Sequence, residues 1–81
     1  MEYEELEWTD VASSNIGAIA YDEEEEYLYV RFLGTGEYIY YGVPERVYRG
    51  MLTAPSKGRY FWRNVRGPNK ARPLYSFDRL S

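Results

Sequence analysis

Tyrosine, arginine and carboxylate side chains are the groups with which this chain could do chemistry, because its 81 residues include no histidine and no cysteine. It therefore lacks the usual general base near neutral pH, the commonest metal ligand and a thiolate nucleophile. Catalysis would need a carboxylate, tyrosine, serine or lysine with a perturbed pKa, and neither Ser13 nor Ser14 has an evident base beside it. We expect a protein that is not an enzyme and uses no cofactor.

Tyrosines at alternate positions form the first candidate binding face. Residues 27–33 alternate with a period of two, as a strand does, and residues 37–43 are predicted as the returning strand of a hairpin. If the turn contains only Gly34 and Thr35, Tyr38 and Tyr40 lie on an exposed face where single-stranded bases could stack. That face would also carry Tyr27, Tyr29 and Arg31. If the turn holds three residues, the register shifts by one and both tyrosines join Leu28, Val30 and Phe32 in the core. The sequence leaves both registers open.

A second candidate is the segment Ser56-Lys57-Gly58-Arg59, which opens a predicted short helix. Free backbone N–H groups at a helix start, a glycine that permits close approach and two cations would suit a phosphate. The segment does not match the P-loop pattern. The alternative is an ordinary turn in which Ser56 caps the helix.

A third candidate is a row of arginines, Arg59, Arg63 and Arg66, spaced four and three residues apart on one helical face. The row either binds phosphates or pairs with acidic residues of the N-terminal part. Taken together, the three candidates predict a set of ligand-binding residues: Tyr38, Tyr40, Ser56, Lys57, Gly58, Arg59, Tyr60, Arg63 and Arg66.

Charge is distributed unevenly along the chain, although the net charge is only −3. Residues 1–26 hold ten acids and no base, whereas residues 27–81 hold three acids and all ten bases. The two halves either neutralise each other across the fold or leave a basic face for an anion. The acidic run from Glu23 to Glu26 lacks the glycine and alternating ligands of a calcium loop, so we expect a solvated turn and no metal.

The pattern predicts one small α+β domain. An antiparallel sheet of three strands is expected at residues 16–21, 27–33 and 37–43, with a possible fourth strand near 8–13. Apolar residues at helical spacing predict a helix over 44–54 that packs on the sheet, and a second short helix is expected to follow at 56–66. Residues 1–10 read as an acidic arm. Residues 67–81 form a tail whose apolar side chains dock on the sheet or on an adjacent subunit.

The central part of the chain, residues 11–66, resembles the KTSC domain, a short module found at the C-terminus of some lysyl-tRNA synthetases and as a stand-alone bacterial or phage protein. The resemblance rests on an ordered set of motifs: Val11, Ser13-Ser14, Ile16, Tyr21-Asp22, Leu28-x-Val30-x-Phe32, Gly36, Tyr38-x-Tyr40, Val43-Pro44, Val47-Tyr48, Leu52, Ala54, Ser56, Gly58, Tyr60-Phe61 and Val65-Arg66. Trp62 departs from the asparagine that the family often has there. The resemblance implies an association with RNA.

These observations favour a non-enzymatic module that binds an anionic ligand, with RNA or single-stranded nucleic acid as the expected partner. One alternative is a protein, of phage origin for example, that sequesters a small nucleotide in an aromatic pocket. Another is a module for protein interaction or homo-oligomerisation, since Tyr, Trp and Arg dominate such interfaces. The acidic N-terminus is no signal peptide, and no apolar run approaches a membrane span. We therefore expect a cytoplasmic protein.

Overall fold

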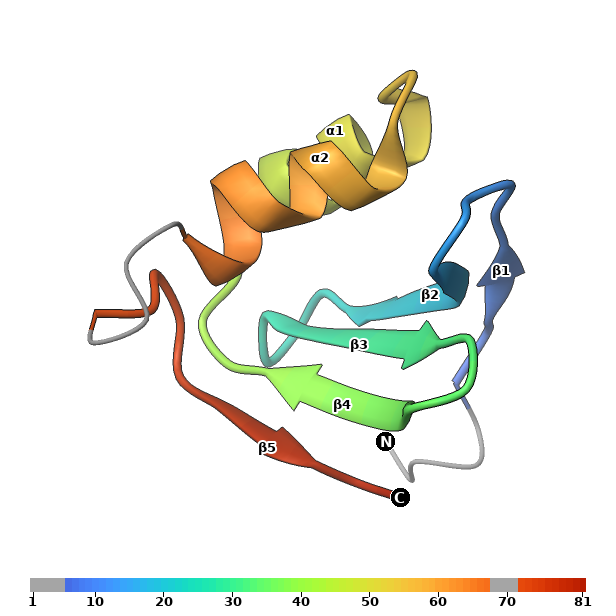
Figure 1. The fold of residues 1–81 in the computed structure, drawn as a ribbon. Helices are drawn as coiled ribbons and strands as arrows, with labels where there is room; N and C mark the ends of the chain where they lie inside the picture. The colour runs from blue at the N-terminus through green and yellow to red at the C-terminus, as the bar shows by residue number, and fades with distance from the viewer. Residues whose placement is uncertain (1–5, 68–71) are drawn as a thin grey trace.

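The computed structural model describes residues 6–67 and 72–81, and within them a single antiparallel sheet lies beneath a layer of helices (Figure 1). Strands adjacent in sequence are adjacent in space, in the order β1-β2-β3-β4-β5. The strands are β1 (Thr9–Asp10), β2 (Ile16–Asp22), β3 (Tyr27–Phe32), β4 (Gly36–Tyr40) and β5 (Phe77–Arg79). The helical segments are α1 (Glu45–Thr53), α2 (Lys57–Phe61) and the π-helical turn η2 (Trp62–Arg66). The predicted α+β class is confirmed.

The hairpin between β3 and β4 has a three-residue loop at residues 33–35, with Val30 opposite Tyr38 and Leu28 opposite Tyr40. The two-residue register is therefore wrong, and the three-residue alternative is confirmed. This register places the apolar residues of both strands on the same face, beneath the helices. Tyr38 is half-buried there and Tyr40 is only 3% exposed.

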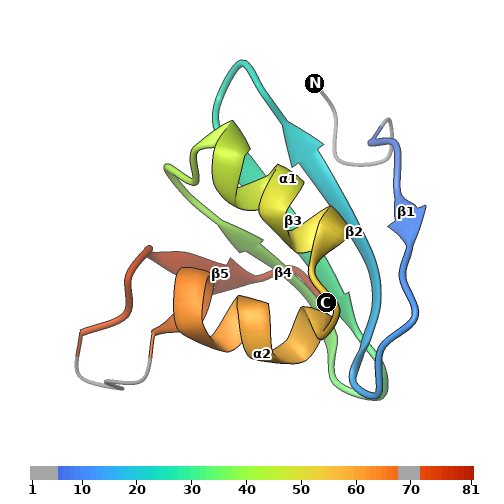
Figure 2. The same ribbon diagram turned by 90° about the horizontal axis from the view of Figure 1, so that it is seen from above.

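The helix α1 packs on the sheet through the stripe that its spacing predicted. Val47 and Met51 are buried, whereas Tyr48 and Leu52 are half-buried against the same core. Seen from above, α1 lies over the strands and α2 crosses beside it (Figure 2). The core cluster joins the sheet to all three helical segments: Ile16, Ile19, Leu28, Val30, Tyr40, Val43, Val47, Met51, Phe61 and Val65.

The second helix begins as predicted, with the Ser56 hydroxyl accepting a hydrogen bond from the backbone N–H of Arg59 at 3.3 Å. Phe61 and Val65 then turn into the core. The last turn widens: the Gly67 N–H donates to the Trp62 carbonyl at 2.7 Å, five residues back. Gly67 ends the turn with a φ of 80°, which a residue with a Cβ rarely adopts.

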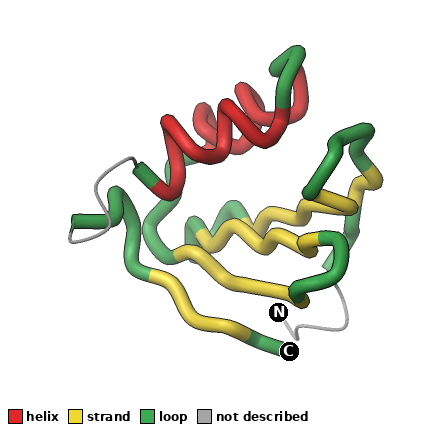
Figure 3. Tube along the Cα trace, in the orientation of Figure 1, coloured by secondary structure: helices red, strands yellow, loops and turns green. Residues whose placement is uncertain are grey.

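The C-terminal tail docks on the sheet and supplies a fifth strand, one more than the highest number expected. β5 pairs with β4, with Phe77 opposite Tyr40 and Arg79 opposite Tyr38. The colouring by secondary structure shows this strand at the edge of the sheet (Figure 3). Residues 68–71 of the predicted tail lie outside the described part of the chain, as do residues 1–5 of the predicted acidic arm.

The face of the sheet away from the helices carries a smaller apolar cluster of Leu6, Ala20, Tyr29 and Ile39. Trp8, Tyr27 and Tyr41 pack against it, and the Arg31 guanidinium lies 4.2 Å from the centre of the Trp8 ring. Arg31 also forms an ion pair with Glu37. Residues of the N-terminal arm thus contact Arg31 and part of the sheet face that carries Tyr27 and Tyr29. In the part of the chain that is described, no helix has the length and apolarity to cross a bilayer.

Candidate functional site

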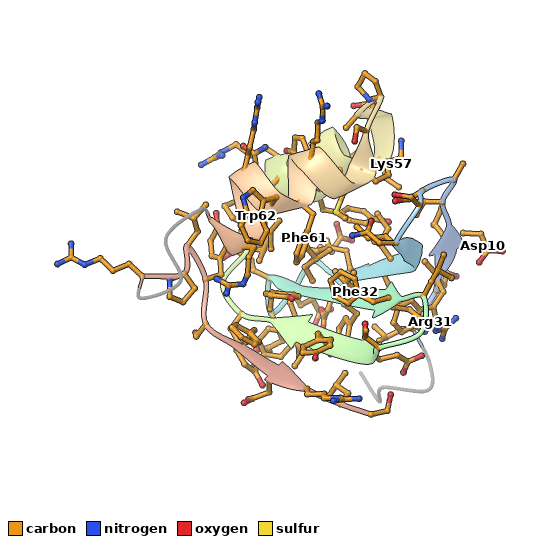
Figure 4. The ribbon with its side chains drawn as sticks, in the orientation of Figure 1. Asp10, Arg31, Phe32, Lys57, Phe61 and Trp62 are labelled. Atoms are coloured by element: carbon orange, nitrogen blue, oxygen red, sulfur yellow. The ribbon has the colours of Figure 1, made fainter. Side chains whose placement is uncertain are left out.

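A cavity of about 380 Å³ opens between α2 and η2 on one side and the sheet on the other. We call it the aromatic cavity, because six rings line it: Phe32, Tyr38, Tyr40, Phe61, Trp62 and Phe77. Figure 4 shows Phe61 projecting from α2 toward Phe32 on the sheet, with Trp62 nearer the edge of the molecule. The remaining lining residues are Asn15, Thr35, Gly58 and Arg66.

The inner rings of the cavity hold one another in place. Phe61 meets Phe32 and Tyr40 edge to face, with both pairs of ring centres 5.3 Å apart. Tyr40 is also within 5.4 Å of Phe77, measured between ring centres. Such edge-on and tilted contacts are favourable beyond the area that they bury. The inner wall of the cavity is therefore preorganised by contacts within the chain.

Arg66 brings a positive charge to this wall. Its Nη1 atom is buried and has no hydrogen-bond partner among the described residues. The centre of its guanidinium lies 5.7 Å from the Trp62 ring and 6.0 Å from the Phe77 ring. A buried donor without an acceptor costs about 1–3 kcal/mol, so an anion or another acceptor that reached Nη1 would relieve this cost.

Tyr40 lies beside this charge as a neutral hydrogen-bonding group. Burial raises the pKa of the Tyr40 phenol well above its ordinary value of 10.0, and the nearby Tyr38 adds to the rise, while the positive charge of Arg66 opposes it. The phenol therefore stays protonated at neutral pH. Arg66 carries the only full charge among the residues that line the cavity.

Trp62 and Arg66 share the cavity because they lie four residues apart on one face of a helical segment. Their turn is π-helical, with a hydrogen bond that spans five residues. Such wide turns are rare and are frequent at functional sites.

Comparison with known proteins assigns the chain to a family. The family model of the KTSC domain matches residues 12–68. This chain belongs to the KTSC domain family. A KTSC domain protein from Yersinia pestis, whose crystal structure is known, is 32% identical and superposes with a TM-score of 0.83, over 94% of this chain and 99% of the other. A protein from Tsukamurella paurometabola is 46% identical over 50 residues, which span 62% of this chain and 75% of that protein.

In this KTSC domain, four of the predicted ligand-binding residues meet at the aromatic cavity: Tyr38, Tyr40, Gly58 and Arg66. Another four, Ser56, Arg59, Tyr60 and Arg63, line a smaller hollow of about 310 Å³ on the outer side of α2. The structure therefore divides the predicted set between two neighbouring surfaces of one helix.

Lys57 is placed elsewhere. Its ammonium donates to the carbonyls of Leu52 at 3.1 Å and Ala54 at 2.6 Å, and so closes the end of α1. Gly58 lies against the Asn15 side chain, whose oxygen is 3.0 Å from where a Cβ would stand. The residues of the predicted phosphate cradle at 56–59 thus do not converge on one point.

The arginines on the outer side of α2 have no acidic partner in the described part of the chain. The ion pairs found there join Arg31 to Glu37 and Arg49 to Glu45. Arg59 and Arg63 are exposed. Within residues 6–67 and 72–81, pairing of the arginine row with the acidic N-terminal part is therefore not observed.

Sequence reasoning missed the residues that complete the cavity: Asn15, Phe32, Thr35, Phe61, Trp62 and Phe77. Phe32 and Phe61 read as core residues, which they also are. Phe77 belongs to the tail that was expected to dock, but no local pattern says that it docks beside Tyr40. Trp62 was a visible signal, because it departs from the family pattern.

Proposed function

We propose that this KTSC domain is a non-enzymatic module that binds RNA or other single-stranded nucleic acid through the aromatic cavity and the arginines of α2 and η2. The observation that carries the proposal is the buried Arg66 Nη1, which has no hydrogen-bond partner among the described residues, on an aromatic wall. Proteins that hold single strands combine cationic groups for the phosphates with rings on which bases stack. Both components occur here on adjoining surfaces.

The arginine row supports a path for the phosphate backbone. Arg59 and Arg63 are exposed on the outer side of the helix, and Arg66 follows at the cavity. Nitrogen-tipped side chains project from this side of the helical layer in Figure 4. A strand that ran along α2 would meet the three cations in order and reach the cavity at Arg66.

The other tyrosine face is a weaker candidate for the same role. Tyr29 is buried beneath the apolar cluster of that face, and Arg31 is engaged by Trp8 and Glu37. A base that stacked on these tyrosines would have to displace contacts that the chain makes with itself. Arg66, by contrast, has a buried nitrogen without a hydrogen-bond partner among the described residues.

The test is a fluorescence-anisotropy titration with a labelled single-stranded RNA at about 50 and 200 mM salt. With three phosphate contacts at a slope of about −0.7 each, affinity is expected to fall about 20-fold over this range. Arg59→Ala and Arg63→Ala should each weaken binding and each reduce the salt slope by about 0.7. Arg46→Ala, an exposed arginine of α1 outside both hollows, is the matched control. Absence of binding at both salt concentrations would overturn the proposal.

A further inference from the structure

Two exposed rings form the rim of the aromatic cavity. Trp62 is 45% exposed and Phe77 is 40% exposed, and both lie within about 6 Å of the same guanidinium, that of Arg66. Large apolar side chains that are exposed together beside a cavity mark a binding surface. Their position at the mouth indicates that an occupant of the cavity would contact both.

Trp62 differs from the inner rings because it is 45% exposed. In the described part of the chain, each inner ring packs against another ring, whereas no ring pair includes Trp62, and the Arg66 guanidinium lies 5.7 Å from the centre of its ring. A planar ligand could therefore lie on Trp62 without breaking an existing ring contact. Phe77 offers a second surface from β5.

We infer that the aromatic cavity is a subsite for one unstacked nucleotide, whose base stacks on Trp62 and Phe77 and whose phosphate accepts hydrogen bonds from Arg66. The inference rests on the proposed function for the class of its ligand and adds the place and number of the bases held. The same chemistry, a base joined to a phosphate, is present in an unpaired residue of an RNA chain and in a free nucleoside monophosphate.

The dimensions and polarity of the cavity support a single nucleotide. Its volume of about 380 Å³ lies at the lower end of the range of about 300–1,000 Å³ for small-molecule sites. Asn15 lines the cavity as well, with its side-chain oxygen accepting from the Ser13 hydroxyl at 3.2 Å. This bond leaves the N–H groups of the Asn15 amide available to the edge of a base.

The experiment compares four probes on the whole protein: a labelled single-stranded RNA, a nucleoside 5′-monophosphate, the corresponding nucleoside, and inorganic phosphate. Binding of the small probes is followed by NMR through the two indole N–H signals. The signal of Trp62 should shift with the monophosphate, whereas that of Trp8, on the opposite face of the sheet, should not. The nucleoside and the phosphate alone should each bind about tenfold or more weakly than the monophosphate, because each lacks one of the two contacts.

Three variants locate the site. Trp62→Leu, Phe77→Leu and Arg66→Gln should each weaken binding of the monophosphate by about tenfold, while Arg46→Gln should leave it unchanged. Trp62 lies on the surface, so the result with Trp62→Leu stands even if Phe77→Leu loosens β5. Thermal unfolding of each variant shows whether its fold is kept.

The outcomes separate the inference from the proposed function. If RNA binds with strong salt dependence but Trp62→Leu and Arg66→Gln have no effect and the monophosphate does not shift Trp62, the inference is overturned and the proposed function stands. If the monophosphate binds at Trp62 but RNA does not bind, the inference is supported with a free nucleotide as the source, and the proposed function is overturned. If neither binds, both are overturned.

Discussion

Two hollows of this KTSC domain are lined by tyrosines and an arginine, but the two differ in how far these groups are already paired. The aromatic cavity holds Tyr38, Tyr40 and Arg66, and the second hollow, of about 640 Å³, holds Tyr21, Tyr48 and Arg49. We call the second the acidic hollow, because its other lining residues are Glu7, Asp22, Glu23, Glu24 and Glu45. The types of residue that suggested a binding site in the sequence therefore occur twice.

The difference lies in which groups are left without partners. In the acidic hollow Arg49 pairs with Glu45 at 2.7 Å, and Tyr21 and Tyr48 stack face to face with ring centres 4.9 Å apart. The Tyr21 hydroxyl donates to the Val43 carbonyl. In the aromatic cavity Arg66 has a buried nitrogen without a hydrogen-bond partner among the described residues, and Trp62 is exposed. The proposed site for an anionic ligand thus differs from the acidic hollow in its unsatisfied groups and not in composition alone.

The largest expected effect comes from removing the ring at the centre of the aromatic cavity. Phe61 is 7% exposed and contacts the rings of Phe32 and Tyr40, so Phe61→Ala should lower the free energy of unfolding by about 3–5 kcal/mol. Chemical denaturation followed by circular dichroism measures this loss. Tyr48→Ala, at the half-buried stack of the acidic hollow, should cost less than half as much.

The control for this prediction is Phe61→Leu, which keeps most of the volume and should cost less than about 1.5 kcal/mol. Equal losses for Phe61→Ala and Tyr48→Ala would mean that the inner wall of the aromatic cavity is no more tightly packed than the acidic hollow. The expected difference in packing between the aromatic cavity and the acidic hollow would then be contradicted.

A smaller effect, with opposite signs for binding and stability, is expected from Arg66→Met. Removing the unpartnered buried Nη1 should raise the free energy of unfolding by about 1 kcal/mol and should abolish the salt-dependent part of RNA binding at the cavity.

Arg49→Met is the counterpart in the acidic hollow. It breaks an exposed ion pair, so it should lower stability by no more than about 0.5 kcal/mol and leave RNA binding unchanged. Thermal unfolding and anisotropy measure the two effects, and a clear loss of stability in Arg66→Met would show that Arg66 is already satisfied.

The smallest effect is a fall in stability at high pH, to which Tyr21 of the acidic hollow and Tyr41, on the face of the sheet away from the helices, both contribute. Burial, with nearby carboxylates, raises the pKa of Tyr21 to about 12. The hydrogen bond that Tyr41 donates to Asp78, 2.7 Å long, raises the pKa of Tyr41 to about 12 as well. Since both values lie above the ordinary value of 10.0, the unfolded chain loses these protons first. The stability that they contribute is complete below pH 10 and is lost as the pH rises from 10 to 12.

Tyr41→Phe sharpens this prediction, because the Tyr41–Asp78 hydrogen bond joins the residue that follows β4 to β5, the strand that carries Phe77. The variant should flatten the pH dependence and loosen β5 without affecting the acidic hollow. Unfolding curves at several pH values, with the absorbance of tyrosinate as a second probe, check both points. A pH profile that is the same in Tyr41→Phe and in the unaltered protein would contradict the role of this bond.

Much of the fold follows from local pattern. The alternation in β3, the stripe of Val47 and Met51 on α1, and the cap at Ser56 each depend on residues close in sequence, and all three are confirmed. The family resemblance is confirmed for the same reason, since its motifs are short and ordered along the chain. These features needed only the period of a strand or helix and the preferences of single residues.

The candidate site depended on choices that no local pattern contains. Whether the hairpin loop held two or three residues decided if Tyr38 and Tyr40 faced outward or inward, and the packing of the whole sheet against the helices settled it. The binding of the Lys57 ammonium at the end of α1 likewise depends on the positions of the Leu52 and Ala54 carbonyls in the folded chain.

The sequence by itself determined the α+β class, the order of the three central strands and the helices that follow them, and the presence of arginines beside aromatic residues, because these depend on local periodicity and composition. Only the tertiary structure decided that Phe77, from the far end of the chain, would pair opposite Tyr40 and that Trp62 and Arg66 would face the rings of the sheet across one cavity. The physical reason is that a cavity is made by contacts between distant elements. Whether the Arg66 Nη1 has a partner among the described residues is likewise known only after the neighbouring groups have been placed.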